Sequence, residues 1–366
     1  MPEFILQNKN DAPKKVLCGM SGGVDSSVAA KLLLENNYDV SGATLRLYDG
    51  EDYEQKLTKT CCSLSDVEDA RSVCLRLNIR HYVFNFKEIF EQQVINDFSQ
   101  KYIDGLTPNP CIECNRHIKF DAMLKRADIL GFDYIATGHY ARIVKSGDRY
   151  LIQKPKDVNK DQTYVLYMLT SEQLKRIVFP LGDLTKSEVR EIAEKNNFLN
   201  ANKKDSQDIC FIPDGKYAEF LKKRCGDFPS GNFVDTSGQV IGKHNGIINY
   251  TIGQRKGLNV SFGKPMFVTN KNAANNTVVL GNSDDLFSKN VKIKNAVFSA
   301  FDNLNQSIKV TAKLRYSAKE AYAVLSKDEN GNYNLAFSEP QRAVTPGQFA
   351  VIYDGDILLG GGEIYI

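Results

Sequence analysis

The chain has 366 residues, of which 42% are hydrophobic and 25% charged, and this ordinary globular composition excludes a disordered tail, a collagen and a coiled coil. No run approaches the roughly 18 apolar residues of a membrane span, and the N-terminus lacks the apolar core of a secretory signal, so we expect a cytoplasmic protein with no membrane partner. The net charge of +3 is too small to indicate nucleic acid by itself, and eight cysteines in so long a chain do not indicate a disulfide scaffold.

The first half of the chain alternates strand and helix patterns. Strands are predicted at residues 14–20, 38–47, 82–86 and 134–137, and helices at 26–36, 66–77, 90–101 and 117–130. Ser65 is the expected N-cap of the second helix. Strands that alternate with helices predict a parallel sheet that is covered on both faces.

The pattern changes after about residue 210, where glycine, asparagine and proline become more frequent. Short alternating strands are predicted at 291–298, 307–314, 321–325, 333–337 and 350–353. Asn330-Gly331 and Asp354-Gly355 are typical hairpin turns. This last part therefore predicts a small β-barrel or sandwich.

Residues 19–27, GMSGGVDSS, follow a predicted strand and open a predicted helix. Glycines let the backbone approach an anion closely, and the N–H groups at the start of a helix bind phosphate. Ser21 and Ser26 add hydroxyl donors, and Asp25 could orient the loop or help to hold Mg²⁺ through the phosphates. Neither GxxxxGK[ST] nor GxGxxG occurs, so the loop is not of the Walker A or dinucleotide-binding type.

Three cysteines lie outside the periodic apolar patterns. Cys111 and Cys114 belong to NPCIECN, residues 109–115, and Cys210 belongs to DSQDICFI, residues 205–212. A cysteine in a polar loop is more reactive than one in a core, and these segments read as polar loops. A CxxC pair by itself would also suit a zinc site or a redox pair, but a second CxxC is missing.

The loop SGGVDSS resembles the PP-loop of the N-type ATP pyrophosphatases, enzymes that cleave ATP to AMP and pyrophosphate and adenylate an oxygen of their substrate. Together with motifs spread over nearly the whole length, it makes the chain resemble the bacterial tRNA-specific 2-thiouridylases. The shared motifs are GMSGGVDSS (19–27), NPCIECN (109–115), YIATGHYAR (134–142), NKDQTYVLY (159–167), DSQDICFI (205–212), YTIGQRKGL (250–258), LRYS (314–317) and TPGQ (345–348).

The resemblance implies ATP-dependent 2-thiolation of the wobble uridine, position 34, in the anticodon of certain tRNAs. Sulfur would come from a cysteine desulfurase or a sulfur-carrier protein. The implied α/β fold has a PP-loop domain with a parallel sheet at 1–212, a small central domain at 213–285, and a C-terminal β-barrel that contacts tRNA at 286–366.

The resemblance also implies roles for single residues. Cys210 would carry the persulfide, and Cys114 would be the catalytic nucleophile. The residues implied for ATP are Gly19, Met20, Ser21, Gly22, Gly23, Val24, Asp25, Ser26, Leu45 beside adenine, and Gly138. Those implied for tRNA are Asn109, Pro110 and Cys111 near the target base, and His139, Lys160, Asp161, Gln162, Arg315, Tyr316 and Gln348.

Cys111 departs from the family pattern, because many members have aspartate at this position. A related group of thiolases holds a [4Fe–4S] cluster with three cysteines, and Cys111, Cys114 and Cys210 could form such a set. Two mechanisms therefore stay open, one through a persulfide and a disulfide, the other through a cluster. Cys61 and Cys62 match no motif, and we expect no functional role for them.

Two other classes of function compete with this interpretation. A PP-loop ligase acting on a small molecule would explain SGGVDSS, but not the paired cysteines or the β-rich last third. A non-enzymatic RNA-binding protein would be expected to have a damaged PP-loop or to lack Cys114 or Cys210, and all of these are present.

Overall fold

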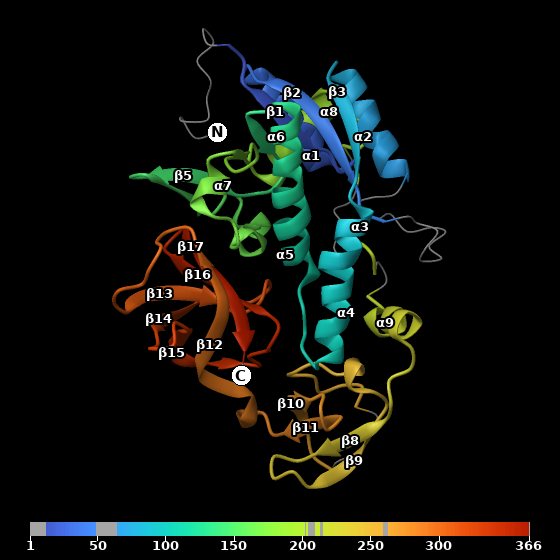
Figure 1. The fold of residues 1–366 in the computed structure, drawn as a ribbon, viewed down its shortest axis with the longest axis vertical. Coiled ribbons are helices and arrows are strands. Elements are labelled where there is room, and N and C mark those ends of the chain that lie inside the picture. Colours follow the sequence, from blue (N-terminus) through green and yellow to red (C-terminus); the bar gives the residue numbers. More distant parts are fainter. Residues whose placement is uncertain are drawn as a thin grey trace.

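The computed structural model describes residues 12–48, 64–201, 203, 209–212, 215–258 and 263–365. Its strands form three sheets of five, four and eight strands. The five-stranded sheet lies at the top of Figure 1, the eight-stranded sheet at the lower left and the four-stranded sheet at the bottom. None of the helices in the described part of the chain is long and apolar enough to cross a membrane.

The five-stranded sheet is parallel, with the order β3-β2-β1-β4-β7. Its strands are β1 (Lys15–Gly19), β2 (Asp39–Arg46), β3 (Arg80–Asn85), β4 (Tyr134–Ala136) and β7 (Ile177–Val178). Val16 and Cys18 pack into the core on one face of β1, and Leu17 packs into the core on the other. Such alternation buries both faces, and the predicted parallel sheet is confirmed.

Three helices accompany this sheet: α1 (Val24–Glu35), α2 (Leu64–Arg76) and α8 (Lys186–Lys195). Helix α2 includes Ser65, which is therefore not the N-cap that we predicted. Helix α8, which was not predicted, begins with a capping box in which Thr185 and Glu188 satisfy each other's backbone N–H groups.

Two long helices lead from the sheet toward the other parts of the molecule (Figure 1). The first comprises α3 (Lys87–Phe90), η3 (Glu91–Ile95) and α4 (Asn96–Ile103). The second comprises α5 (Pro110–Cys114), η4 (Asn115–Ala122) and α6 (Met123–Leu130). The second helix thus begins at Pro110 rather than at the predicted residue 117. Asn109 caps it by accepting a hydrogen bond from the N–H of Cys111, and proline suits the first helical position.

The C-terminal part forms a closed six-stranded barrel, because β12 pairs with both β15 and β17. Its strands are β12 (Phe287–Phe298), β13 (Ile308–Lys313), β14 (Ala321–Lys327), β15 (Tyr333–Arg342), β16 (Phe349–Asp354) and β17 (Ile357–Tyr365). The predicted barrel is confirmed, and β17 completes it. A hairpin from the first half, β5 (Arg142–Ser146) and β6 (Arg149–Gln153), extends the same sheet through pairing of β6 with β17.

The small sheet has the order β10-β11-β8-β9. Its strands are β8 (Gly231–Val234), β9 (Val240–His244), β10 (Phe267–Asn272) and β11 (Thr277–Gly281), and α9 (Tyr217–Cys225) precedes them. Phe233 and Val268 of this sheet share an apolar cluster with Phe98 and Tyr102 of α4. The short elements that complete the fold are η5 (Val158–Lys160), η6 (Thr163–Leu166), α7 (Ser171–Leu174), η7 (Ile247–Asn249) and η8 (Asp284–Leu286).

Candidate active site

The glycine-rich loop lies between β1 and α1, at the carboxyl end of the central strand. Gly22 has φ +71°, and a Cβ at this position would come within 2.5 Å of the Asp66 carbonyl oxygen. The hydroxyl of Ser26 accepts from the N–H of Ser21 at 3.2 Å and donates to the Gly23 carbonyl at 3.0 Å. Gly138 approaches the start of α1 so closely that a Cβ would lie 2.9 Å from the backbone N of Ser26. The loop is thus held in one shape, with N–H groups at the start of a helix.

The carboxylate of Asp25 binds two side chains that the sequence analysis did not single out. Lys186 Nζ lies 2.8 and 2.9 Å from the two oxygens, and the Tyr140 hydroxyl donates to the carboxylate at 2.9 Å. Lys186 belongs to the first turn of α8, and its side chain is 12% exposed. Asp25 thereby holds a cation beside the glycine-rich loop, where it can offset the charge of a bound phosphate.

The far side of the loop is held by Asn200 and Lys203. Asn200 Nδ2 donates to the Gly22 carbonyl at 3.0 Å and to the Ser27 hydroxyl at 2.9 Å. Lys203 Nζ lies 2.6 Å from Asp66 and 2.8 Å from Asp69. Burial acts to lower the pKa of Lys203, but its hydrogen bonds to these aspartates outweigh burial and raise it, so the amine is protonated.

The cysteines of the CxxC pair lie in a helix, not in the polar loop that the sequence indicated. Cys111 is exposed in the first turn of α5, and Cys114 is buried with 7% of its surface exposed. The helix starts this early because the Asn-Pro pair caps it, and its next residues then turn toward the core. Burial of Cys114 and exposure of Cys111 give two neighbouring thiols very different access to solvent.

Cys210 lies in a tight turn and is partly buried. Ile209 and Ile212 form an isolated antiparallel bridge around it, and the Tyr48 hydroxyl donates to the Cys210 carbonyl at 2.8 Å. The turn packs against the apolar cluster that also contains Cys114. The structure therefore brings Cys114 and Cys210 to one cluster from segments about a hundred residues apart.

The predicted three-cysteine ligand set is not assembled. Across the described ranges no three His, Cys, Asp or Glu residues are grouped to hold a metal ion. None of the cysteines in those ranges forms a disulfide. The arrangement does not fit a [4Fe–4S] cluster held by Cys111, Cys114 and Cys210. Cys61 and Cys62 lie outside the described residues.

Most of the residues predicted to contact tRNA gather where the barrel meets the first half of the chain. The Tyr316 hydroxyl lies 3.5 Å from the Asp161 carbonyl, and Lys313 lies 3.5 Å from the Asp161 carboxylate. Gln348 donates to the Thr107 carbonyl at 2.7 Å, beside the start of α5. Arg315 is exposed and Lys160 and Gln162 are partly exposed, whereas Asn109 and Pro110 begin the helix of Cys114.

His139 is the exception, because it lies inside the core rather than on this surface. It is 7% exposed, and its Nδ1 lies 2.8 Å from the Thr137 hydroxyl. Its ring packs near Phe120 and Phe179. Burial lowers the pKa of His139 well below its usual value, so the ring is neutral. Leu45, predicted beside adenine, is partly buried near the end of β2.

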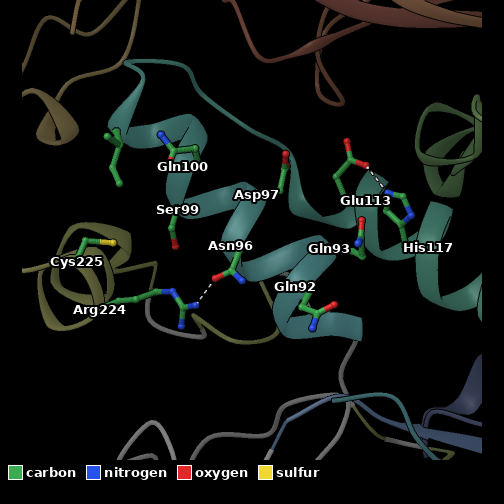
Figure 2. Close-up of a pocket in the computed structure, with 11 residues that line it drawn as sticks. Gln92, Gln93, Asn96, Asp97, Ser99, Gln100, Glu113, His117, Arg224 and Cys225 are labelled. Carbon is green, nitrogen blue, oxygen red and sulfur yellow. Dashed lines mark hydrogen bonds and ion pairs between the residues drawn. The ribbon is translucent and has the colours of Figure 1, made fainter. Parts of the chain in front are cut away.

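A cavity of about 800 Å³ lies beside Glu113, the residue before Cys114 (Figure 2). Residues of α4 line its middle, Glu113 and His117 lie on one side, and Arg224 and Cys225 of α9 lie on the other. Burial acts to raise the pKa of Glu113, but hydrogen bonding to His117 and the nearby cations lower it overall. The remaining lining residues are mostly amides and other polar side chains: Gln92, Gln93, Asn96, Asp97, Ser99, Gln100 and Ile103.

Known proteins similar to this chain match it over nearly its whole length. It is 52% identical over 355 residues to a protein of Acetivibrio thermocellus named tRNA-specific 2-thiouridylase MnmA, covering 96% of this chain and 99% of that protein. It is 51% identical over 354 residues to the protein of the same name from Clostridioides difficile, covering 96% and 98%. The chain belongs to the tRNA-specific 2-thiouridylase family. The resemblance seen in the sequence motifs is confirmed.

Three family models match consecutive parts of this 2-thiouridylase family member. They are described as a tRNA methyl transferase HUP domain at residues 14–214, a tRNA methyl transferase PRC-barrel domain at 218–282 and an aminomethyltransferase β-barrel domain at 288–364. Among solved structures, a 4-thiouridine synthetase–RNA complex with bound ATP aligns with 58% of this chain and 50% of that chain, at 19% identity and a TM-score of 0.39.

Lys186 and Tyr48 are among the site residues that the sequence analysis missed, together with Tyr140, Asn200 and Lys203. The segment Thr185-Lys186-Ser187-Glu188 is a capping box, which could have revealed the start of α8. Nothing in the local pattern could have placed the Lys186 amine on Asp25, 161 residues earlier. Tyr48 follows the predicted strand 38–47, and its bond to Cys210 spans 162 residues.

Proposed function

We propose that this chain is a tRNA-uridine 2-sulfurtransferase that adenylates the C2 oxygen of uridine 34 and replaces that oxygen with sulfur from a persulfide. One observation carries this proposal beyond family membership. Leu45 near the end of β2 is only three residues from Tyr48, whose hydroxyl binds the Cys210 carbonyl. Residues proposed for nucleotide binding and for sulfur delivery are thus joined through one short segment.

Adenylation is needed because the C2 oxygen of uridine is a poor leaving group. In this proposal the oxygen attacks the α-phosphorus of ATP, pyrophosphate leaves, and AMP then departs with the oxygen when sulfur attacks C2. Residues Gly19–Ser26 and Gly138 would bind the phosphates, and Lys186 would offset their charge. Mg²⁺ would bind together with ATP, through the phosphates. The described residues include no group of three histidine, cysteine or acidic side chains that could hold the ion without ATP.

Sulfur transfer would use Cys210 and Cys114. Cys210 would receive its outer sulfur from a cysteine desulfurase or a carrier protein, which its partial exposure allows. Attack by the Cys114 thiolate on Cys210 Sγ would release hydrosulfide toward C2 and leave a disulfide between the two residues. The apolar cluster that buries Cys114 and packs against Cys210 would limit the access of water, which would otherwise return the activated base to uridine.

The anticodon would lie on the surface where the barrel meets the first half of the chain. Asn109, Pro110 and Cys111 would face the target base, and His139 would support this region from the core. The boundaries 1–212, 213–285 and 286–366 remain our proposal for the domains. The parallel sheet, the four-stranded sheet and the six-stranded barrel support them, and the hairpin β5–β6 of the first domain joins the barrel sheet. The residues proposed to contact tRNA outside the base site are Lys160, Asp161, Gln162, Arg315, Tyr316 and Gln348.

The proposed function is tested by supplying ATP, a cysteine desulfurase with cysteine, and unmodified tRNA, and measuring 2-thiouridine by mass spectrometry of nucleosides. We expect one AMP and one pyrophosphate per thiolated base. Exchange of pyrophosphate into ATP is expected to require tRNA. Exchange that proceeds without tRNA, together with no thiolation, would favour a ligase that acts on a small molecule.

Arg315→Ala, Lys160→Ala and Gln348→Ala are each expected to weaken tRNA binding more than ATP binding. Because the two cations would contact phosphates, each of their variants should lower the slope of log affinity against log salt by about 1. Affinities measured by filter binding at several salt concentrations check this. Lys195→Ala is the control, since its side chain is 76% exposed in α8. Unchanged tRNA affinity in all three variants would show that the proposed contacts are wrong.

Tyr48→Phe is expected to slow sulfur transfer while leaving adenylation within about twofold of the original rate. The substitution removes only the hydroxyl that binds the Cys210 carbonyl, a neutral hydrogen bond worth about 1 kcal/mol, so a loss of about fivefold is expected. Single-turnover thiolation and pyrophosphate exchange separate the two steps. Equal losses in both steps would indicate a general structural defect, and no loss in either would exclude a positioning role for Tyr48.

A further inference from the structure

The three cysteines of the site differ sharply in their access to solvent. Cys111 is exposed, Cys210 is partly buried, and Cys114 is buried with 7% exposed. In the proposed function, each turnover leaves a disulfide between Cys114 and Cys210. The Cys114 sulfur of that disulfide is therefore shielded from external thiols, and the Cys210 sulfur is only partly exposed to them. The enzyme needs a route by which two electrons reach this bond before another persulfide can form.

Cys111 is well placed to provide this route. It lies three residues before Cys114 in one continuous helix, and residues with this spacing are neighbours on a helix surface. In a regular helix the Cα atoms at this spacing are about 5 Å apart, within the range of a disulfide, but the Cβ atoms are about 5–6 Å apart, so this disulfide requires a shift of the first helical turn. Cys111 also lies in the first helical turn, where the positive end of the helix dipole favours a thiolate.

Other thiols in the described residues are poorly suited to this role. Cys18 and Cys74 are buried in the core of the parallel sheet, and burial raises the pKa of Cys74 to about 12. Cys225 is exposed, but it lies at the end of α9, on the other side of the cavity from Glu113 (Figure 2). Cys225 therefore offers a matched control, an exposed thiol outside the proposed sulfur-transfer site.

We propose that Cys111 is the resolving cysteine of this enzyme. The Cys111 thiolate attacks Cys114 Sγ, the bond between Cys114 and Cys210 breaks, and its electron pair leaves on Cys210 Sγ, which becomes a thiolate. The disulfide has now moved to Cys111 and Cys114, with no net oxidation or reduction. A dithiol reductant then attacks the exposed sulfur of Cys111, is itself oxidised to a disulfide, and returns both cysteines to thiols. This step rests on the proposed function, because it consumes the disulfide formed there.

The surroundings of Cys111 suggest when this reduction occurs. Tyr316 of the barrel, a proposed tRNA contact, lies near Cys111. Burial and the charges of Asp161 and Cys111 raise the pKa of Tyr316, while the charge of Lys160 acts to lower it. A tRNA bound at Tyr316 would cover Cys111. Reduction through Cys111 would then follow release of the thiolated tRNA.

The test compares the unaltered enzyme with Cys111→Ser and Cys225→Ser, each loaded with a persulfide on Cys210 for a single turnover and supplied with a cysteine desulfurase and cysteine for repeated turnover. For Cys111→Ser we expect at most a threefold loss in a single turnover, but at least a tenfold loss over many turnovers at low dithiothreitol. Cys225→Ser should match the unaltered enzyme in both measurements. After one turnover without reductant, peptide mapping should find a Cys111–Cys114 disulfide in the unaltered enzyme and a Cys114–Cys210 disulfide in Cys111→Ser.

Three results would overturn the proposal. The first is a Cys114–Cys210 disulfide as the end product of the unaltered enzyme. The second is full activity of Cys111→Ser over many turnovers at low reductant. The third is a parallel loss of single-turnover activity and protein-bound iron in Cys111→Ser, which would make the residue a cluster ligand. If the unaltered enzyme forms no 2-thiouridine at all, the proposed function itself fails, and the resolving role with it.

Discussion

Cys114→Ser and Cys210→Ser are each expected to abolish 2-thiouridine formation under any sulfur supply, with a loss of at least about a thousandfold. A serine hydroxyl is not ionised at neutral pH, so it neither carries a persulfide nor attacks one. Both cysteines pack in one apolar cluster, although they come from distant parts of the chain. Mass spectrometry of nucleosides from treated tRNA measures the product.

The same two variants should retain exchange of pyrophosphate into ATP, because adenylation precedes sulfur transfer. Cys225→Ser provides the matched control for the loss of a thiol. Circular dichroism before and after heating checks that the variants are folded. Thiolation by Cys210→Ser at even a tenth of the original rate would contradict the persulfide role, and thiolation by Cys114→Ser at that rate would contradict the nucleophile role.

Asp25→Ala and Ser26→Ala are each expected to abolish activity by preventing adenylation. Asp25 holds Lys186 and Tyr140 against the loop, and Ser26 binds the loop backbone at two points. Hydrogen-bond donors that are preorganised around a developing negative charge each increase the reaction rate about a hundredfold to a thousandfold. Lys186→Met should cause a comparable loss while Asp25 remains. Pyrophosphate exchange in the presence of tRNA measures all three variants.

Lys195→Met is the control for Lys186→Met, since both residues belong to α8 and the Lys195 side chain is 76% exposed. The control should keep its exchange rate within about twofold. Near-normal thiolation in both Asp25→Ala and Ser26→Ala would show that the loop does not bind ATP phosphates. If Lys186→Met keeps normal pyrophosphate exchange while Asp25→Ala and Ser26→Ala lose it, only the role assigned to Lys186 is wrong.

The glycine-rich loop and the parallel sheet could be predicted from the sequence because their causes are local. Gly22 has a left-handed φ, which glycine itself permits. The buried strand β1 and the helix α1 that follows the loop are indicated by patterns within a few neighbouring residues. The barrel could also be predicted, because its strands alternate and its turns contain Asn-Gly and Asp-Gly. Most of the motifs of the 2-thiouridylase family lie in these elements or next to them.

The helix of Cys114 was misread because its polar residues resemble a loop. Glu113 is charged, yet it is only 6% exposed. It stays ionised in the interior because Lys101 lies 3.6 Å from it and His117 lies 3.4 Å from it. Lys101 also lies 4.0 Å from Glu363 in the barrel. A carboxylate compensated by residues from other elements cannot be distinguished from a surface carboxylate in the sequence.

The sequence by itself determined the family, the glycine-rich loop, the parallel sheet and the terminal barrel. Only the tertiary structure decided which partners complete the site: Lys186 on Asp25, Tyr48 on the Cys210 carbonyl, and the hairpin β5–β6 on the barrel strand β17. The two hydrogen bonds span 161 and 162 residues. Local patterns depend on neighbours within a turn or a strand, whereas these contacts depend on how whole elements pack, which no short stretch of sequence encodes.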